Sequence, residues 1–248
     1  MKTFQNQKIS QIVTENLKAA EILENHGIDF CCGGDKTIVE ACQDKDLQVE
    51  SVEAELEKAM NETDSETTWI KNLDASELSE YIVKRHHSFI RENIPPLKKY
   101  LEKICQVHGK NHAELFEVKG EFNKATEALT DHLREEEKTI FPVVHEMVQA
   151  KKENRSIQAP CFGIVSDPIR RMQEDHKQEG ERFDRLAEKT DNFKVPDDGC
   201  NTFRLSYDRL RAFVSDLHKH IHLENNILFP QALQLEKETV RCDQKNGL

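Results

Sequence analysis

Two segments of the chain repeat a histidine–glutamate pattern that suits metal binding. HLREEEKTIFP, which begins at His132, and HIHLENNILFP, which begins at His220, both read H-x-x-x-E-x-x-x-x-F-P. A spacing of four residues places Glu136 and Glu224 on the same helix face as the preceding histidine. Each pair alone could be an ordinary hydrogen-bonded pair. Because the pattern occurs twice on core-facing stripes, we interpret it as a set of metal ligands.

More histidines interrupt stripes that a stable core would keep apolar. His176 lies on the stripe of a third helix, and His86 and His87 lie beside that of another. Histidines 87, 132, 176 and 220 are 45, 44 and 44 residues apart, so antiparallel helices of similar length bring them to one level. A buried imidazole or carboxylate without a partner is costly, and a bound cation offsets that cost for several groups at once. Helical periodicity does not separate His86 from His87.

This set of donors favours iron. Four imidazoles and two carboxylates combine borderline nitrogen with hard oxygen, and they suit two ions bridged by the carboxylates. Zinc fits less well because it prefers thiolates or a closed tetrahedral site. Two Fe(II) ions would leave a net positive charge beside the two carboxylates, so open coordination positions would accept anionic oxygen or nitrogen ligands.

The segment GIDFCCGG contains adjacent cysteines, Cys31 and Cys32. Such a pair could form a metal site, a redox pair, a reactive handle or merely a structured corner. The following glycines allow unusual backbone angles and are expected to leave the thiols accessible. The seven cysteines are an odd, scattered set without a C-x-x-C motif, which argues against a disulfide framework and a zinc knuckle.

The composition excludes several classes of partner. The 248 residues carry a formal net charge of -11, which disfavours nucleic acid and acidic lipid surfaces. The sequence shows no signal-peptide core and no apolar run long enough to span a bilayer. We therefore expect a cytoplasmic protein that does not enter a membrane.

Periodicity of three to four residues predicts an all-α protein with two parts. Residues 1–62 are expected to form a small helical domain that carries the Cys-Cys motif, and residues 63–74 a linker. Residues 75–240 are expected to form an up-down four-helix bundle, and residues 241–248 a tail. The predicted bundle helices span residues 75–107, 111–149, 165–190 and 201–236. His218 and His222 fall on the opposite face from the ligands and are expected to face solvent.

Together these motifs resemble the repair of iron centres family, the di-iron proteins of hemerythrin-like fold. That family joins a short domain with a G-[IV]-D-[FY]-C-C-G-G signature to a hemerythrin-like four-helix bundle. The resemblance implies two iron ions in a non-haem centre, bridged by both glutamates, and leaves an oxo bridge in the oxidised state open. The implied ligands are His87, His132, Glu136, His176, His220 and Glu224, with His86 as the reserve for His87. It also suggests His86, His108 and Asp175 as nearby or exchangeable groups.

The resemblance implies a function in repairing iron–sulfur proteins damaged by nitric oxide or oxidants. Donation of iron is the favoured mechanism, in which Cys31 and Cys32 engage the outgoing iron or the client protein. One alternative is an enzyme that reduces nitric oxide to nitrous oxide at the di-iron site. Another is a hemerythrin-like sensor of oxygen or nitric oxide. The identity of the clients and the formation of a homodimer stay open.

Overall fold

A computed structural model describes residues 4–159 and 164–242 and is almost entirely helical, as predicted. Cys161 and residues 243–248 of the predicted tail lie outside the described residues. The N-terminal part contains α1 (Ile9–Glu15), α2 (Lys18–Asn25), α3 (Ile38–Asp44), α4 (Val49–Met60) and α5 (Ser65–Ile70). The larger part contains α6 (Ala75–Ile82), η1 (Val83–His87), α7 (Ser88–His108), α8 (Glu114–Glu135), η2 (Glu136–Ile140), α9 (Phe141–Lys152), α10 (Ser166–Lys189), α11 (Asn201–Leu223), η3 (Glu224–Leu228) and α12 (Phe229–Thr239). Two short strands, β1 (Ile157–Ala159) and β2 (Val240–Cys242), pair in parallel.

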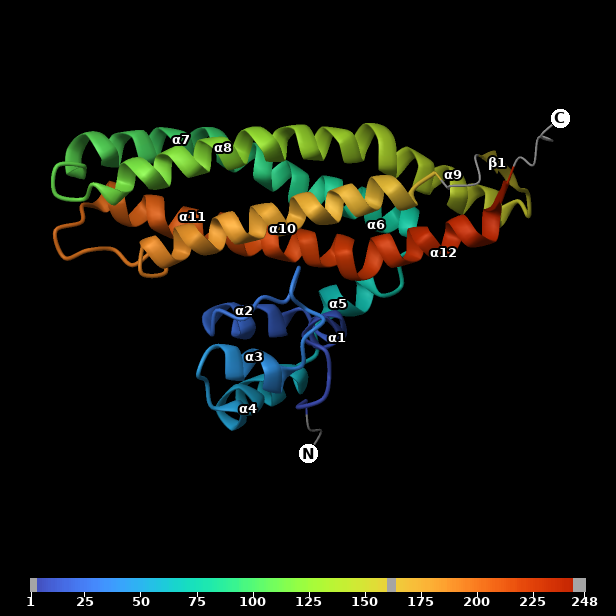
Figure 1. Ribbon diagram of the computed structural model, residues 1–248, viewed down its shortest axis with the longest axis horizontal. Coiled ribbons are helices and arrows are strands. Elements are labelled where there is room, and N and C mark those ends of the chain that lie inside the picture. The colour runs from blue at the N-terminus through green and yellow to red at the C-terminus, as the bar shows by residue number, and fades with distance from the viewer. Residues whose placement is uncertain (1–3, 160–163, 243–248) are drawn as a thin grey trace.

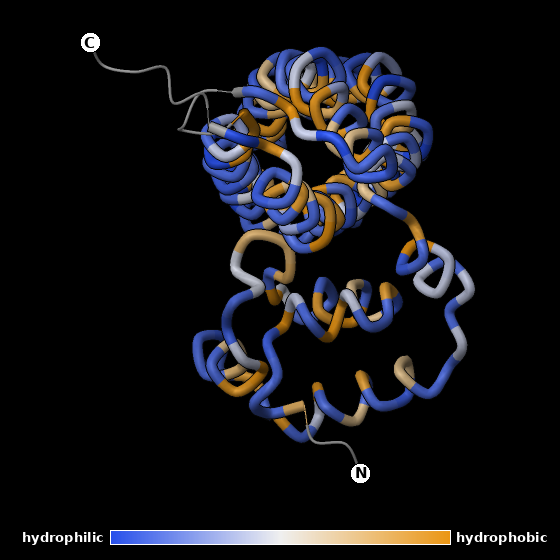
Figure 2. The backbone as a smooth tube through the Cα atoms, turned by 90° about the vertical axis from the view of Figure 1, so that its right-hand side faces the viewer, coloured by the Kyte–Doolittle hydropathy of each residue, from blue (hydrophilic) through white to orange (hydrophobic). Residues whose placement is uncertain are grey.

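The larger part is a bundle of four long rods, as the sequence predicted (Figure 1). The rods are α6–η1–α7, α8–η2–α9, α10 and α11–η3–α12. Apolar residues line the inner side of each rod, as the end view shows (Figure 2). In the core, the rings of Phe122 and Phe213 from different rods lie 5.5 Å apart. Burial of such side chains is the main stabilising contribution to a bundle of this kind.

Three of the rods contain a π-helical turn, which the helical periodicity did not predict. In these turns the backbone N–H bonds to the carbonyl five residues earlier, as from Phe141 to Glu136 and from Phe229 to Glu224. Pro142 and Pro230 follow directly, and a proline has no N–H for the normal α-helical bond. The wide turn accommodates this loss within a continuous helix. π-Turns are rare and often mark functional sites, and here they contain or begin at His87, Glu136 and Glu224.

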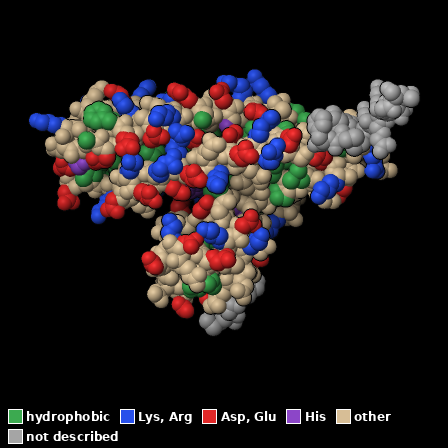
Figure 3. All heavy atoms as spheres, in the orientation of Figure 1, with side chains coloured by type: hydrophobic (Ala, Val, Ile, Leu, Met, Phe, Trp, Pro, Cys, Tyr) green, Lys and Arg blue, Asp and Glu red, His purple; other side chains and the backbone are tan. Residues whose placement is uncertain are grey.

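The N-terminal helices form a compact unit that packs beside the middle of the bundle (Figures 1 and 2). Its core includes Phe4, Ile12 and Phe30, which are almost completely buried. The segment expected to be a linker, residues 63–74, contains α5, whose Ile70 is also buried. Charged side chains of both signs cover the visible face of the bundle (Figure 3). In the part of the chain that the structure describes, no helix combines the length and apolar character needed to cross a membrane.

The turn at residues 29–34, here called the Cys-Cys turn, is built around Asp29. Its carboxylate accepts hydrogen bonds from the backbone N–H groups of Cys31, at 2.9 Å, Cys32, at 3.0 Å, and Gly33, at 2.7 Å. Gly34 then lies so close to α1 that an added Cβ would be 2.7 Å from the Cβ of Ser10, and it would also be 2.6 Å from the Phe30 carbonyl oxygen of the turn itself. A side chain at this position therefore requires the backbone to move.

We expect Gly34→Ala to lower the free energy of unfolding by about 2 kcal/mol, because it forces an overpacked contact against backbone. Gly120→Ala is the matched control. Gly120 lies in α8 with nothing within 4 Å of an added Cβ, so alanine there is expected to stabilise the helix by about 1 kcal/mol. Chemical denaturation monitored by circular dichroism measures both changes. Equal effects of the two substitutions would contradict this account of the turn.

Candidate metal centre

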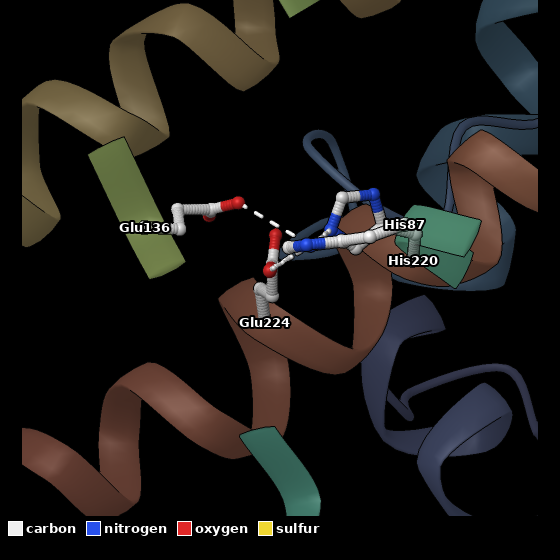
Figure 4. Close-up of side chains that lie close together, drawn as sticks. All are labelled: His87, Glu136, His220 and Glu224. Carbon is white, nitrogen blue, oxygen red and sulfur yellow. Dashed lines mark hydrogen bonds and ion pairs between the residues drawn. The ribbon is translucent and has the colours of Figure 1, made fainter. Parts of the chain in front are cut away.

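Six side chains from the four rods converge in the bundle core in two sets. His87 and His220 form the first pair, with their Nε2 atoms 3.2 Å apart. His132 and His176 form the second pair, with their Nε2 atoms 2.9 Å apart. Each pair, together with Glu136 and Glu224, brings its donor atoms within 4.8 Å of one another and could hold a metal ion. The first set is seen in Figure 4.

Each glutamate faces both sets. One Glu136 oxygen lies 3.5 Å from His87 Nε2, and the other lies 3.2 Å from His132 Nε2. One Glu224 oxygen lies 2.9 Å from His220 Nε2, and the other lies 3.3 Å from His176 Nε2. Each carboxylate thus directs one oxygen to the first set and the other oxygen to the second set. This arrangement suits carboxylates that bridge a pair of ions.

The burial of these groups fits a cation. Glu136 and Glu224 are completely buried, and among the described residues no donor meets any of their four oxygens at hydrogen-bonding angles. Buried polar atoms without hydrogen bonds are rare in stable proteins and call for a compensating interaction. Positive metal ions between the two glutamates would supply that compensation.

The charges within the site keep the ligands in mixed protonation states. Burial opposes ionisation of Glu224, but the charge of His220 and contact with His176 hold the pKa of Glu224 well below its usual range. Burial likewise favours neutral His132, but the charges of Glu136 and Glu224 raise the pKa of His132 to about 9. For His220 burial prevails and lowers its pKa. Glu224 is therefore ionised at neutral pH, which is the form that binds metals.

The outer nitrogens of the histidines have different partners in the two sets. His87 Nδ1 lies 2.7 Å from a Glu137 oxygen, which also lies 2.8 Å from Arg91. His176 Nδ1 instead pairs with the amide oxygen of Asn225 at 2.9 Å. Such partners orient a ligating imidazole, and a carboxylate makes it a stronger donor than an amide does. Glu137 and Asn225 directly follow Glu136 and Glu224, and that adjacency was the signal available in the sequence.

The structure separates the two adjacent histidines of the first rod. His87 contributes to the first donor set. His86 lies outside that set and stacks on the ring of His220, with the two ring centroids 6.0 Å apart. His86 Nδ1 pairs with Asp216 at 3.1 Å. Asp175 lies near the second set, with one oxygen 3.6 Å from His132 Nδ1.

His108, suggested as a group near the site, is not near it. It is the last residue of α7, and the 21-residue length of that helix separates it from His87 by about 30 Å. Its ring contacts Phe203 at the far end of the bundle. A hydrogen bond from His108, with backbone N–H groups at the start of α11, lowers the pKa of the exposed Cys200 to about 7.

His218 and His222 were expected to face solvent, and this is wrong because the N-terminal unit covers their side of α11. His222 is completely buried, with Nδ1 3.3 Å from the Phe30 carbonyl oxygen. His218 lies 3.3 Å from Glu24. Periodicity gives the direction of a side chain from its helix axis but not what packs against that side.

The Cys-Cys turn is docked on the bundle rather than open to solvent. Cys31 is buried and Cys32 is partly exposed, and their unbonded sulfurs lie 3.8 Å apart. The contact with Cys32, burial and the charge of Asp29 together raise the pKa of Cys31 well above its usual range. Asn225 donates to the Cys31 carbonyl oxygen at 3.4 Å and also pairs with His176. One residue therefore connects the turn to the second donor set.

The fold and the two donor sets define a hemerythrin-like helical bundle with a candidate two-metal centre. Residues 79–232 match the family described as "Hemerythrin HHE cation binding domain". Residues 5–60 match ScdA_N, described as a domain of unknown function (DUF542).

Two similar proteins match the chain over nearly their whole length. The "Iron-sulfur cluster repair protein ScdA" of Staphylococcus haemolyticus is 32% identical over 221 residues, 89% of this chain and 95% of that protein. The "Iron-sulfur cluster repair protein YtfE" of Yersinia pestis is 32% identical over 233 residues, 94% of this chain and 99% of that protein. The chain belongs to the family of ScdA and YtfE, which confirms the family predicted from the motifs.

The position of Cys200 at the start of α11 predicts unusual thiol reactivity. Because its pKa is lowered to about 7, a large fraction is thiolate at neutral pH, whereas Cys31 stays protonated. Iodoacetamide should therefore alkylate Cys200 faster than Cys31 near neutral pH, as peptide mass spectrometry would measure. His108→Ala should slow the reaction of Cys200 near neutral pH but not at high pH, and the remote control His26→Ala should leave it unchanged. Faster labelling of Cys31 would contradict the assignment.

Proposed function

We propose that this protein holds two iron ions on six residues of the bundle core and supplies iron for the repair of damaged iron–sulfur clusters. The observation that carries the proposal is the pair of donor sets joined by Glu136 and Glu224. Each glutamate has one oxygen near the first set and its other oxygen near the second. The relatives ScdA and YtfE bear the name iron-sulfur cluster repair protein, which supports the same function for this chain.

The donors fit iron in number and kind. Each set offers two imidazole nitrogens and an oxygen from each glutamate, a mixture that suits Fe(II). Two ferrous ions would bring four positive charges against the two negative charges of the carboxylates, so the centre would stay open to anionic ligands. Iron would provide a redox-active cation with free coordination positions at this site.

The same donors suit a protein that donates its metal ion to another protein. The sets contain no thiolate, which is the ligand that holds iron in iron–sulfur clusters. The second set is also the more accessible of the two: His132 is 8% exposed, whereas His87 and His220 are completely buried. We therefore propose that iron leaves from the His132/His176 side, where the Cys-Cys turn is docked through Asn225.

In this proposal the thiols act as the receiving group. The Cys32 sulfur lies 3.7 Å from the position of a Cβ added to Gly180, one helical turn beyond His176 on α10. A thiol next to the second set could take up iron as it leaves and present it to a client protein. The raised pKa of Cys31 means that its thiol would lose its proton only when a metal ion approaches.

We expect the protein to bind about two equivalents of Fe(II) per chain, and the variant Glu136→Ala/Glu224→Ala to bind none, because it lacks both bridging groups. The metal content after anaerobic loading measures this directly, and iron should raise the melting temperature of the wild-type protein but not that of the double variant. Glu135→Ala, which changes an exposed neighbour, is the matched control. Reactivation of a damaged cluster enzyme by the iron-free double variant would overturn the proposal.

Replacement of the thiols separates iron storage from iron delivery. Cys31→Ser/Cys32→Ser should keep both iron ions, because neither sulfur belongs to a donor set. It should nevertheless reactivate a damaged enzyme more slowly, and it should release iron more slowly to a thiol-free chelator. Cys42→Ser, which changes a buried cysteine elsewhere in the N-terminal unit, serves as the control. Unchanged rates of both processes would exclude the thiols from delivery.

A further inference from the structure

A row of aromatic rings leads from the surface to the first donor set. The ring centroids of Trp69 and Tyr81 lie 5.2 Å apart. Those of Tyr81 and His86 lie 5.7 Å apart, and those of His86 and His220 lie 6.0 Å apart. Each ring therefore packs against the next, and the last belongs to a residue of the candidate metal centre.

Exposure falls steadily along this row. Trp69, on the short helix α5 beside the bundle (Figure 1), is 51% exposed. Tyr81 is partly buried, His86 is 4% exposed and His220 is completely buried. The row thus connects solvent to the interior without a break, and its outer end is the single tryptophan of the sequence.

The hydroxyl group of Tyr81 has a partner suited to proton transfer. It donates a hydrogen bond of 2.6 Å to an oxygen of Glu66, which is exposed. Burial and the neighbouring Glu66 raise the pKa of Tyr81 well above its usual range, so the phenol is neutral at physiological pH. A phenol that loses an electron becomes strongly acidic, and the Glu66 carboxylate is placed to take the proton.

The other tyrosines have different surroundings. Tyr100 lies against the guanidinium group of Arg209, and Tyr207 packs between Phe193 and Phe203. Neither ring contact leads toward a donor set. Packing of α5 on the bundle would explain an aromatic ring at position 81, but it does not require the carboxylate beside its hydroxyl group.

We propose that Trp69, Tyr81 and His86 form a path for single electrons between the protein surface and the metal centre at His220, with Glu66 as the proton acceptor of Tyr81. The reaction partner at the surface is a one-electron radical oxidant that acts on Trp69. The step at the inner end rests on the proposed function, whereas the steps at Trp69 and Tyr81 do not.

The electrons and protons of each step balance. A radical oxidant removes one electron from the Trp69 indole, which releases its N–H proton to water. Tyr81 then reduces the indole radical by one electron and gives its phenolic proton to Glu66, while the indole nitrogen regains a proton from water. Bound Fe(II) would supply, by its own one-electron oxidation, the electron that His220 and His86 carry to the Tyr81 radical, while Glu66 returns the proton.

The outer steps can be measured in the metal-free full-length protein. Azide radicals generated by pulse radiolysis oxidise indole selectively, and Trp69 is the only indole present. We expect the tryptophan radical absorption to decay as tyrosyl radical absorption grows, at a rate independent of protein concentration. Tyr81→Phe, which keeps the ring, should lose this growth, and the control Tyr100→Phe should retain it. Equal decay in the wild-type protein and Tyr81→Phe would overturn the path.

Two further measurements test the proton acceptor and the inner end. Glu66→Gln should slow the growth of the tyrosyl radical, and an unchanged rate would remove Glu66 from the path.

Loading with Fe(II) should shorten the lifetime of the Tyr81 radical relative to the metal-free protein, and His86→Leu should abolish the shortening while the iron content stays constant. An unchanged lifetime in iron-loaded protein would overturn the connection to the metal centre. Failure to bind iron would instead refute the proposed function, and the outer steps would still be observed.

Discussion

Two carboxylates, Glu136 and Glu224, lie completely buried in the middle of a helical bundle, and the groups around them must neutralise their charge. Isolated charges in such a position would destabilise the fold by several kcal/mol. The surrounding histidines offset part of that cost, as the depressed pKa of Glu224 and the raised pKa of His132 indicate. A cation held between the carboxylates would offset the remainder. The four rods, and the π-turns that begin at both glutamates, hold these groups at one level.

The surroundings of the two donor sets are unequal. The first set is completely buried, and its His87 is supported by the charged Glu137. In the second set, His176 is supported by the neutral amide of Asn225, which also contacts the Cys-Cys turn, and the exposed Asp175 lies 3.6 Å from His132. A carboxylate strengthens an imidazole as a donor more than an amide does. In our proposals the first set therefore retains its ion and exchanges electrons through His86, while the second set, beside the thiols, releases its ion.

The position of the N-terminal unit changes the interpretation of the GIDFCCGG motif. The sequence suggested an open turn with accessible thiols, but the turn is held by Asp29 and packed against the bundle. His222, expected to face solvent, is completely buried at the same interface. The two parts of the chain thus share a buried contact region, in which Cys31 is buried and Cys32 stays partly exposed.

The all-α fold, the family and the six candidate ligands could be predicted from the sequence, because hydrophobic periodicity and the H-x-x-x-E repeat act within single helices. Helical periodicity did not separate His86 from His87, since neighbours on a helix differ by only about 100°, and the preference for His87 came from the family resemblance. The sequence analysis also missed the π-turns, although the Phe-Pro that follows each glutamate was a signal for two of them. It also suggested His108 as a group near the site, from which the structure separates it. These points follow from the tertiary structure. So do the pairing of Glu137 and Asn225 with the histidines and the row of aromatic rings from Trp69 to His220. Most of these contacts join residues far apart in the chain, and they depend on how rigid helices pack against each other rather than on any local pattern.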